Sequence, residues 1–258
     1  MKKIGITTIF TGNNNYGGVL QAYALQRSIR DMLPKDYEVE HINFGYNQNP
    51  IYHNLLSRSR QYSLGQIIKK FKEICIERKT YQIGDKLKKR LSLFDEFRNK
   101  FLRQSKNYGI NEHAQIGKDY DILITGSDQV WNPNVIRDVF TFDFPTNAKK
   151  IAYAASISRN ALTKREKEYM LPRISSFNHV GIREKTAQSI LAEEGISSQV
   201  VLDPTMLLTK DDWEKVSSQR IINEPYVFIY SFSNCSLKSE IEKYWPKGDC
   251  PWRADAAA

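Results

Sequence analysis

The 258-residue sequence predicts an α/β fold built on a parallel sheet, and three observations carry this prediction. A β-rich run, a Gly/Asn-rich loop, a helical stretch and a second β-rich run follow one another at the N-terminus, which is the order of a βαβ unit. Further along, near-continuous apolar runs are typical of strands that are buried on both faces. Polar segments follow these runs at the strand ends, where ligands bind in open parallel sheets.

The first unit consists of a strand over Lys2–Phe10, a helix over Tyr16–Met32 and a strand over Glu38–Phe44. The two strands are rich in β-forming residues, and the helix has apolar residues at helical spacing. Four later strands are expected at Asp121–Thr125, Lys150–Ala155, His179–Ile182 and Gln199–Leu202. Before the last of them, a helix over Glu184–Glu194 is expected to stop at Gly195.

A basic helical insert over about 51–110 interrupts this alternation. It carries 15 Lys and Arg against five Asp and Glu, a net charge of +10, whereas the whole chain carries +9. Its apolar stripe, which includes Phe94, Phe97 and Phe101, is expected to pack in the core or in a lid. The charge is either a solvated helical face or an attraction for phosphate-bearing substrates, an anionic membrane surface or nucleic acid.

The sequence also predicts where the domains of the chain begin and end. We expect one domain over residues 1–216, a linker over 217–224 and the start of a second domain over 225–258. The second domain would open with a strand at Tyr226–Phe232 and end in a tail without periodicity. An incomplete domain exposes strand edges and apolar surface, so self-association is predicted.

Cysteine and histidine usage excludes several classes. The three cysteines have no paired spacing, which argues against a disulfide scaffold and favours a reducing compartment. The four histidines show no metal-binding pattern, and His179 is expected to be a satisfied core residue. No export signal and no apolar run of membrane-spanning length is present, so a cytoplasmic location is expected.

The first candidate site is the loop that joins the first strand to the first helix. Its glycines, Gly17 and Gly18, allow close approach of a ligand, and helix N-terminal N–H groups favour an anion. Asn15 and Gln21 add amides that can bind sugar hydroxyls, and Tyr16 lies between them. The pattern is neither GxGxxG nor a Walker loop, so dinucleotide and ATP binding are not predicted. A plain tight turn is the alternative.

The second candidate site follows the strand that ends at Thr125. It comprises Gly126, Ser127, Asp128, Gln129, Trp131 and Asn132. The Trp131 ring is expected to stack on a sugar, and the polar side chains are expected to bind its hydroxyls. An ordinary Asx-turn is the alternative interpretation.

Two further strand ends carry Ser156 and the pair Arg183-Glu184. Arg183 can hold a phosphate or carboxylate through its planar fork, or it can form a structural ion pair. Asp203-Pro-Thr205, after the last strand, is interpreted as a turn or a helix start.

Taken in order, these segments resemble the polysaccharide pyruvyl transferase family. The matching stretches are Asn15-Tyr-Gly-Gly-Val-Leu-Gln-Ala-Tyr-Ala-Leu-Gln26, Gly126-Ser-Asp-Gln-Val-Trp-Asn-Pro133, Ala152-Tyr-Ala-Ala-Ser156, Arg183-Glu-Lys185 and Val201-Leu-Asp-Pro-Thr205. The resemblance runs from about residue 3 to about residue 232.

The resemblance implies two Rossmann-like domains that face one another across a cleft, as in GT-B-type glycosyltransferases. It implies phosphoenolpyruvate as donor substrate, no cofactor or metal, and a saccharide or lipid-linked saccharide as acceptor for cell-surface exopolysaccharide. The loops Asn15–Gly18 and Gly126–Trp131 would line the acceptor side of the cleft. The basic insert would suit a diphosphate-linked acceptor or the inner face of the membrane.

The catalytic histidine of the family is expected in a Ser-Phe-His-Gly-like segment of the second domain, which this sequence does not contain. We therefore expect a truncated member that departs from the family pattern after about Tyr244 and shows no pyruvyl transfer alone. The alternatives are a saccharide-binding half-enzyme without catalysis and a basic nucleic-acid-binding protein. No recognised nucleic-acid module accompanies the charge.

Overall fold

The computed structural model describes residues 2–10, 14–45, 85–220 and 222–224. The chain divides into two compact units, Met1–Trp213 and Glu214–Ala258. The predicted domain division at 216 and 225 stays a prediction, and the strand expected at Tyr226–Phe232 lies outside the described residues. The same holds for the part of the basic insert before Asp85.

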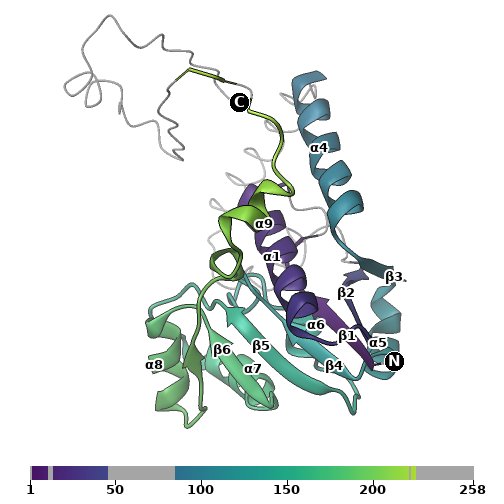
Figure 1. Cartoon of the computed structure of the whole chain (residues 1–258). Coiled ribbons are helices and arrows are strands. Elements are labelled where there is room, and N and C mark those ends of the chain that lie inside the picture. The colour runs from purple at the N-terminus through teal and green to yellow at the C-terminus, as the bar shows by residue number, and fades with distance from the viewer. Residues whose placement is uncertain (1, 11–13, 46–84, 221, 225–258) are drawn as a thin grey trace, which may run out of the picture. The chain divides into compact units, whose positions relative to one another are not determined.

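The described strands form one seven-stranded parallel sheet in the order β3-β2-β1-β4-β5-β6-β7 (Figure 1). They are β1 (Lys2–Thr7), β2 (Tyr37–Phe44), β3 (Gln104–Tyr108), β4 (Ile122–Thr125), β5 (Lys149–Ala155), β6 (His179–Ile182) and β7 (Gln199–Val200). Ile4 of β1 pairs with Val39 on one side and Ile122 on the other, so β1 and β4 lie side by side. The predicted α/β, Rossmann-like class is confirmed.

Helices connect these strands. They are α1 (Tyr16–Met32), α4 (Asp85–Phe101), α5 (His113–Asp119), α6 (Asp138–Thr141), α7 (Lys164–Ile174), α8 (Lys185–Glu193) and α9 (Lys210–Glu214), with 3₁₀ turns η1 (Ile110–Glu112) and η2 (Pro204–Met206). The predicted first helix has the observed bounds, and the predicted stop at Gly195 is confirmed. The N–H of Ile196 donates to Leu191 O at 2.9 Å, and Gly195 has a φ of 73°.

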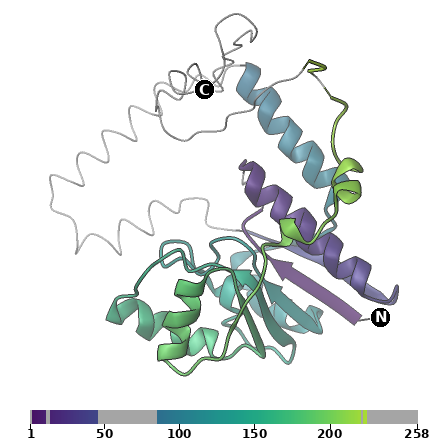
Figure 2. The same cartoon turned by 60° about the vertical axis from the view of Figure 1, so that its left-hand side comes forward.

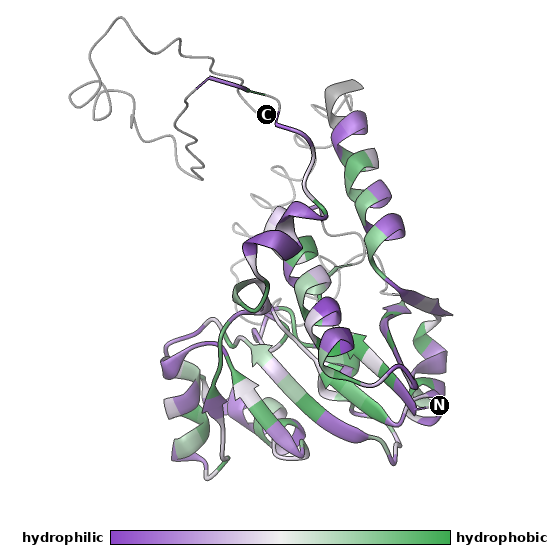
Figure 3. Ribbon diagram, viewed as in Figure 1, coloured by the Kyte–Doolittle hydropathy of each residue, from purple (hydrophilic) through white to green (hydrophobic). Residues whose placement is uncertain are grey.

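The helices cover the sheet on two faces (Figures 1 and 2). On one face, α1 packs Leu25 and Ile29 against apolar residues of β1, β2 and β4. On the other face, α5, α6, α7 and α8 bury residues such as Ile116 and Ile174 in a larger core. The central strands are mainly apolar beyond the two lysines with which β1 and β5 each begin, while the helices carry polar outer surfaces (Figure 3). This pattern is expected for a sheet that is buried on both sides.

Helix α4 packs its aromatic stripe against α1, which confirms the core interpretation of that stripe. Phe94 is buried, and the rings of Phe97 and Phe101 lie 5.9 and 6.1 Å from the ring of Tyr23. The prediction that the insert stays helical to about residue 110 is wrong. Residues 104–108 form edge strand β3, because tertiary pairing with β2 overrides the local pattern.

The histidine prediction also needs correction, because among the histidines that the structure describes it is His41 that is buried, and not His179. His179 is exposed at the start of β6. His41 is fully buried on β2, with its Nε2 3.0 Å from Ala22 O. Burial lowers the pKa of His41 to about 4, against a small opposing effect of the Ala22 hydrogen bond. The ring is therefore neutral at physiological pH and acts as a core residue.

Candidate functional site

The strand order reverses direction at β1, because the chain proceeds from β1 towards β3 on one side and from β4 towards β7 on the other. In open parallel sheets, ligands bind outside the carboxyl ends of the strands at such a switch point. A cavity of about 480 Å³ lies there. Its lining residues are Ile9, Asn15, Gly17, Gly18, Gln21, Asp128, Gln129, Val135, Arg183, Asp203 and Thr205. We call it the switch-point pocket.

The β1–α1 loop places Asn15 as the N-cap of α1. Its side-chain oxygen accepts hydrogen bonds from the N–H groups of Gly17, at 2.8 Å, and of Gly18, at 3.4 Å. Two of the N-terminal donors of α1 are thus already satisfied, which weakens the predicted anion site at this helix end. The sequence signal at Asn15 is therefore in part a capping signal.

Gln21, one turn into α1, is 3% exposed. Its Nε2 donates to Thr8 Oγ1 and to Gly18 O, both at 2.9 Å. Because Gly18 O can only accept, the amide is oriented with its nitrogen on that side. Its Oε1 has no hydrogen-bond partner among the described residues. Gln21, a lining residue of the pocket, therefore carries a buried acceptor that lacks a donor, which is costly unless a ligand or water supplies one.

The segment after β4 turns sharply at Gly126, whose φ is 113°. A Cβ there would lie 2.1 Å from Tyr153 O, so only glycine fits beneath the loop. Ser127 is fully buried and Asp128 adopts a φ of 71°. The side chain of Asp128 accepts from Gln129 N at 2.8 Å. This turn directs Asp128 and Gln129 into the pocket.

The prediction for Trp131 in this segment is corrected, whereas the contact of Asn132 with a sugar stays a prediction. Trp131 is fully buried, its Nε1 donates to Phe140 O at 3.1 Å, and its ring packs edge-on against Phe177. No face of the Trp131 ring is accessible to a sugar, because the side chain is fully buried. Burial of its large apolar surface stabilises the core instead. Asn132 does not line the pocket. Its Oδ1 accepts from Asn134 N at 3.0 Å, which is the Asx-turn alternative.

Glu184, which follows β6, is hydrogen-bonded to the loop after β5. One carboxylate oxygen, Oε1, accepts from Ser156 Oγ at 3.0 Å and from the N–H groups of Ile157 and Ser158 at 2.9 and 3.0 Å. Ser156 Oγ also lies 2.7 Å from Ser158 Oγ. Ser156 and Glu184 therefore hold the loop after β5 and do not line the switch-point pocket.

Arg183 and Asp203 form an ion pair at the pocket wall. Arg183 NH1 donates to Asp203 Oδ2 at 3.1 Å, and Ser127 Oγ donates to the same oxygen at 3.1 Å. Thr205 donates to Asp203 Oδ1 through its N–H at 3.0 Å and its hydroxyl at 2.7 Å. Burial by itself would raise the pKa of Asp203, but the hydrogen bonds from Thr205, Arg183 and Ser127 hold it below its ordinary value. Asp203 therefore remains ionised.

The structure brings half of the fourteen predicted site residues together in one pocket. These are Asn15, Gly17, Gly18, Gln21, Asp128, Gln129 and Arg183. Ser127 does not line the pocket but donates a hydrogen bond to Asp203, which does. Tyr16 lines a separate apolar groove between α1 and α4. Sequence reasoning did not predict Thr8, Asp203 or Thr205 as site residues. It singled out Asp203-Pro-Thr205 as a strand-end segment that resembles the family, but interpreted it as a turn or a helix start.

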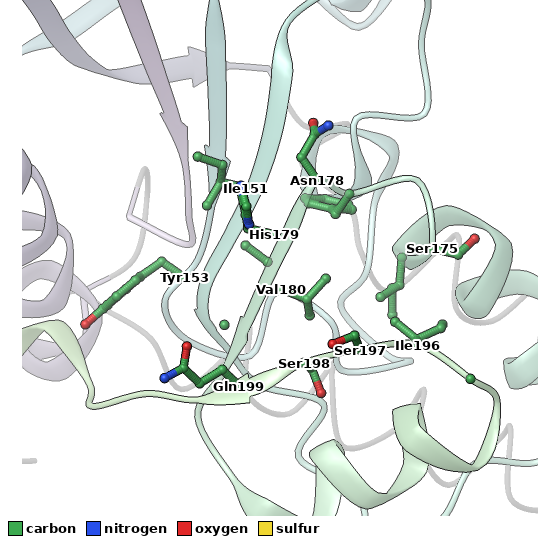
Figure 4. Close-up of a pocket in the computed structure, with 15 residues that line it drawn as sticks. Ile151, Tyr153, Ser175, Asn178, His179, Val180, Ile196, Ser197, Ser198 and Gln199 are labelled. Atoms are coloured by element: carbon green, nitrogen blue, oxygen red, sulfur yellow. The ribbon is translucent and has the colours of Figure 1, made fainter.

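A larger cavity, of about 550 Å³, lies elsewhere on the sheet (Figure 4). Its walls come from β5, β6 and β7 and from the segments that precede β6 and β7, including Asn178, His179 and Gln199. These segments approach the amino ends of the strands, and none of the predicted site residues lines the cavity. Size alone does not make it the better candidate, because it lacks the converging charged groups of the switch-point pocket.

Within the described residues, no group of three or more His, Cys, Asp and Glu side chains is placed to hold a metal ion. None of the helices in the same part of the chain has the length and apolar character needed to cross a bilayer.

The chain was compared with known protein families, curated proteins and solved structures. The model of a family described as polysaccharide pyruvyl transferase matches residues 15–255. The expected departure from the family pattern after about Tyr244 is therefore wrong, since the match continues through the tail. No curated protein and no solved structure matches the chain.

Proposed function

Since the chain belongs to the polysaccharide pyruvyl transferase family and is thus a transferase of polysaccharide biosynthesis, we propose that it uses phosphoenolpyruvate as donor and a cell-surface saccharide as acceptor. The observation that carries this proposal is the switch-point pocket, where one arginine lies among carboxylates and amides. A guanidinium is suited to a carboxylate or phosphate, and the neutral and acidic groups are suited to hydroxyls.

The reaction makes two demands on the site. Two hydroxyls of the acceptor form bonds to the central carbon of the enolpyruvyl group while the bond from that carbon to the phosphate oxygen breaks. One hydroxyl proton ends on the methylene carbon, which becomes a methyl group, and the other leaves with phosphate. The site must therefore hold an anionic donor beside a neutral polyol, and it must orient the two reactants together.

Arg183 is the group in the pocket that meets the first demand, since it is the cation among the described lining residues. The N-terminal end of α1, with Asn15–Gln21, and the loop with Asp128–Gln129 meet the second demand on the acceptor side. Asp128 and Gln21 Oε1 accept hydrogen bonds, and hydroxyls can donate them. At neutral pH the donor substrate offers mainly carboxylate and phosphate oxygens, which accept, so it complements Arg183 and not these groups.

The assay is incubation of the 258-residue chain with phosphoenolpyruvate and a panel of bacterial-type oligosaccharides. Phosphate release that depends on the saccharide, together with a ketal methyl signal in the product by NMR, would support the proposal. A saccharide-binding half-enzyme predicts saccharide binding without phosphate release. That second result would replace the proposed transfer by the binding alternative.

Replacing Gln21 with methionine is expected to weaken saccharide binding roughly tenfold, because a hydrogen bond to a buried acceptor is lost at unchanged side-chain length. The measurement is an NMR titration of the protein with methyl glycosides of common hexoses. Gln26→Met is the matched control on the same helix. The Gln26 amide bonds both the O and the N of Arg103, at 2.8 and 2.9 Å, outside the pocket.

The Gln26→Met control is expected to lower the free energy of unfolding by about 1–3 kcal/mol and to leave saccharide affinity unchanged. Equal loss of affinity in both variants would show that Gln21 acts through the stability of α1 and would contradict a direct contact.

We also propose that the basic segment 51–110 brings the chain to an anionic, cytoplasmic membrane surface that carries a lipid-linked acceptor. The net charge of +10 in this segment supports the proposal. Co-sedimentation with phosphatidylglycerol vesicles is expected at low salt and should fall steeply as salt is added. Equal sedimentation with phosphatidylcholine vesicles would contradict it.

A further inference from the structure

Asp203 differs from the other charged residues of the switch-point pocket, because each of its two carboxylate oxygens accepts two hydrogen bonds. Oδ1 accepts the N–H and the hydroxyl of Thr205, and these bonds close a turn at the start of η2. Oδ2 accepts the Ser127 hydroxyl and Arg183 NH1. The carboxylate thereby connects the loops after β4, β6 and β7. Its orientation is fixed from three directions.

Arg183 is held much less completely. Its side chain is 31% exposed, and the bond to Asp203 is the one side-chain hydrogen bond found for it among the described residues. A guanidinium has five N–H donors in a rigid fork, so one contact sets the plane of the group while the remaining donors stay available for a ligand. A long side chain without such a contact samples many rotamers, and ordering it would oppose binding.

We propose that Asp203 is a positioning residue for Arg183: it holds the guanidinium at the pocket wall, ready to receive the anionic group of the donor. This rests on the proposed function, in which Arg183 binds phosphoenolpyruvate. Asp203 itself does not contact the donor, because its carboxylate is negatively charged and repels an anion. Its two oxygens also already accept four hydrogen bonds. The turn with Thr205 and the Ser127 hydroxyl keep the carboxylate in the geometry that Arg183 needs.

The decisive variant is Asp203→Asn. The asparagine oxygen can keep both bonds from Thr205, so the turn is retained. Its NH₂ group then faces Arg183 NH1, where two donors meet and the arginine loses its acceptor. We expect the dissociation constant of phosphoenolpyruvate, measured by calorimetry, to rise roughly tenfold, while the affinity for methyl glycosides changes little.

Asp143→Asn is the matched control. It makes the same change in another arginine–aspartate pair, in which Arg173 Nε donates to Asp143 Oδ2 at 2.8 Å outside the switch-point pocket. Donor affinity should change less than about threefold. In the Arg183→Met background, Asp203→Asn should cause no further loss of donor affinity, because residues that act through one another are not additive.

The order of the Arg183 side chain supplies a readout that does not need donor binding. In the unsubstituted chain its Nε–Hε NMR signal should indicate restricted motion, and in Asp203→Asn it should indicate a mobile side chain. Unchanged order in Asp203→Asn would overturn the inference, as would an equal effect of this substitution with and without Arg183. If the chain binds no phosphoenolpyruvate but Asp203→Asn still mobilises Arg183, the positioning role stands and the proposed donor is wrong.

Discussion

Replacing Gly126 with alanine is expected to destabilise the fold by more than about 3 kcal/mol, because two separate costs add at this position. The φ of 113° lies in a region that L-residues rarely adopt. The new Cβ would also lie 2.1 Å from Tyr153 O and 3.1 Å from Tyr153 C, which are backbone atoms of the neighbouring strand β5. Backbone atoms of a strand cannot yield as the end of a flexible side chain can, and Tyr153 directly follows Ala152, the last residue of β5 that pairs with β4.

The measurement is urea denaturation of both proteins, followed by circular dichroism. Gly195→Ala is the matched control, because Gly195 also has a positive φ, of 73°, but a Cβ there would meet no atom within 4 Å. It should cost only about 1–2 kcal/mol, the strain of the left-handed conformation. If both alanines cost the same, backbone strain alone would explain the effect, and the proposed contact with Tyr153 O would be refuted.

Replacing Arg183 with methionine is expected to lower kcat/KM for phosphoenolpyruvate about 100-fold or more. The change removes the cation of the switch-point pocket and leaves Asp203 without its charged partner. Each hydrogen bond from a charged group contributes about 1.5–3 kcal/mol, and the guanidinium fork can make two of them to the carboxylate or phosphate of the donor. The stability cost should be far smaller, because both side chains are partly exposed and solvent screens the pair.

The control for Arg183 is Arg173→Met. Arg173 also pairs with an aspartate, since its guanidinium lies 2.8 Å from Asp143 Oδ2, and it is similarly exposed. It lies near the end of α7, outside the switch-point pocket, so kcat/KM should stay within about twofold of the unsubstituted value. An equal loss of activity in both variants would indicate that arginine pairs matter here for stability, and the role of Arg183 as donor-binding group would fail.

Local patterns were sufficient for most of the fold. The helical spacing from Tyr16 to Met32 predicts the bounds of α1, and Gly195 marks the end of α8. Buried parallel strands such as β5, which is apolar from Ile151 to Ala155, are visible in the sequence as apolar runs. Strand β3 was missed because its sequence, Gln-Ser-Lys-Asn-Tyr, has no such pattern and is extended only through pairing with β2.

The site was predictable to the extent that strand ends of a parallel sheet meet at one edge. Asn15, Asp128 and Arg183 are far apart in sequence but line one cavity for this reason. Which side chains face that cavity was not predictable. A tryptophan at position 131 could either stack on a ligand or fill the core, and the sequence does not distinguish the two. In the structure its ring packs against Phe177 in the core.

By itself, the sequence determined the α/β class, the chain order of the main strands and the family to which residues 15–255 belong. These depend on periodicity and on motifs within short stretches of chain. Only the tertiary structure decided that Asp203 meets Arg183 and Ser127, and that Gln21 Oε1 lacks a donor. Hydrogen bonds between loops depend on distances and burial, and both are set by how the strands pair and pack rather than by any local pattern.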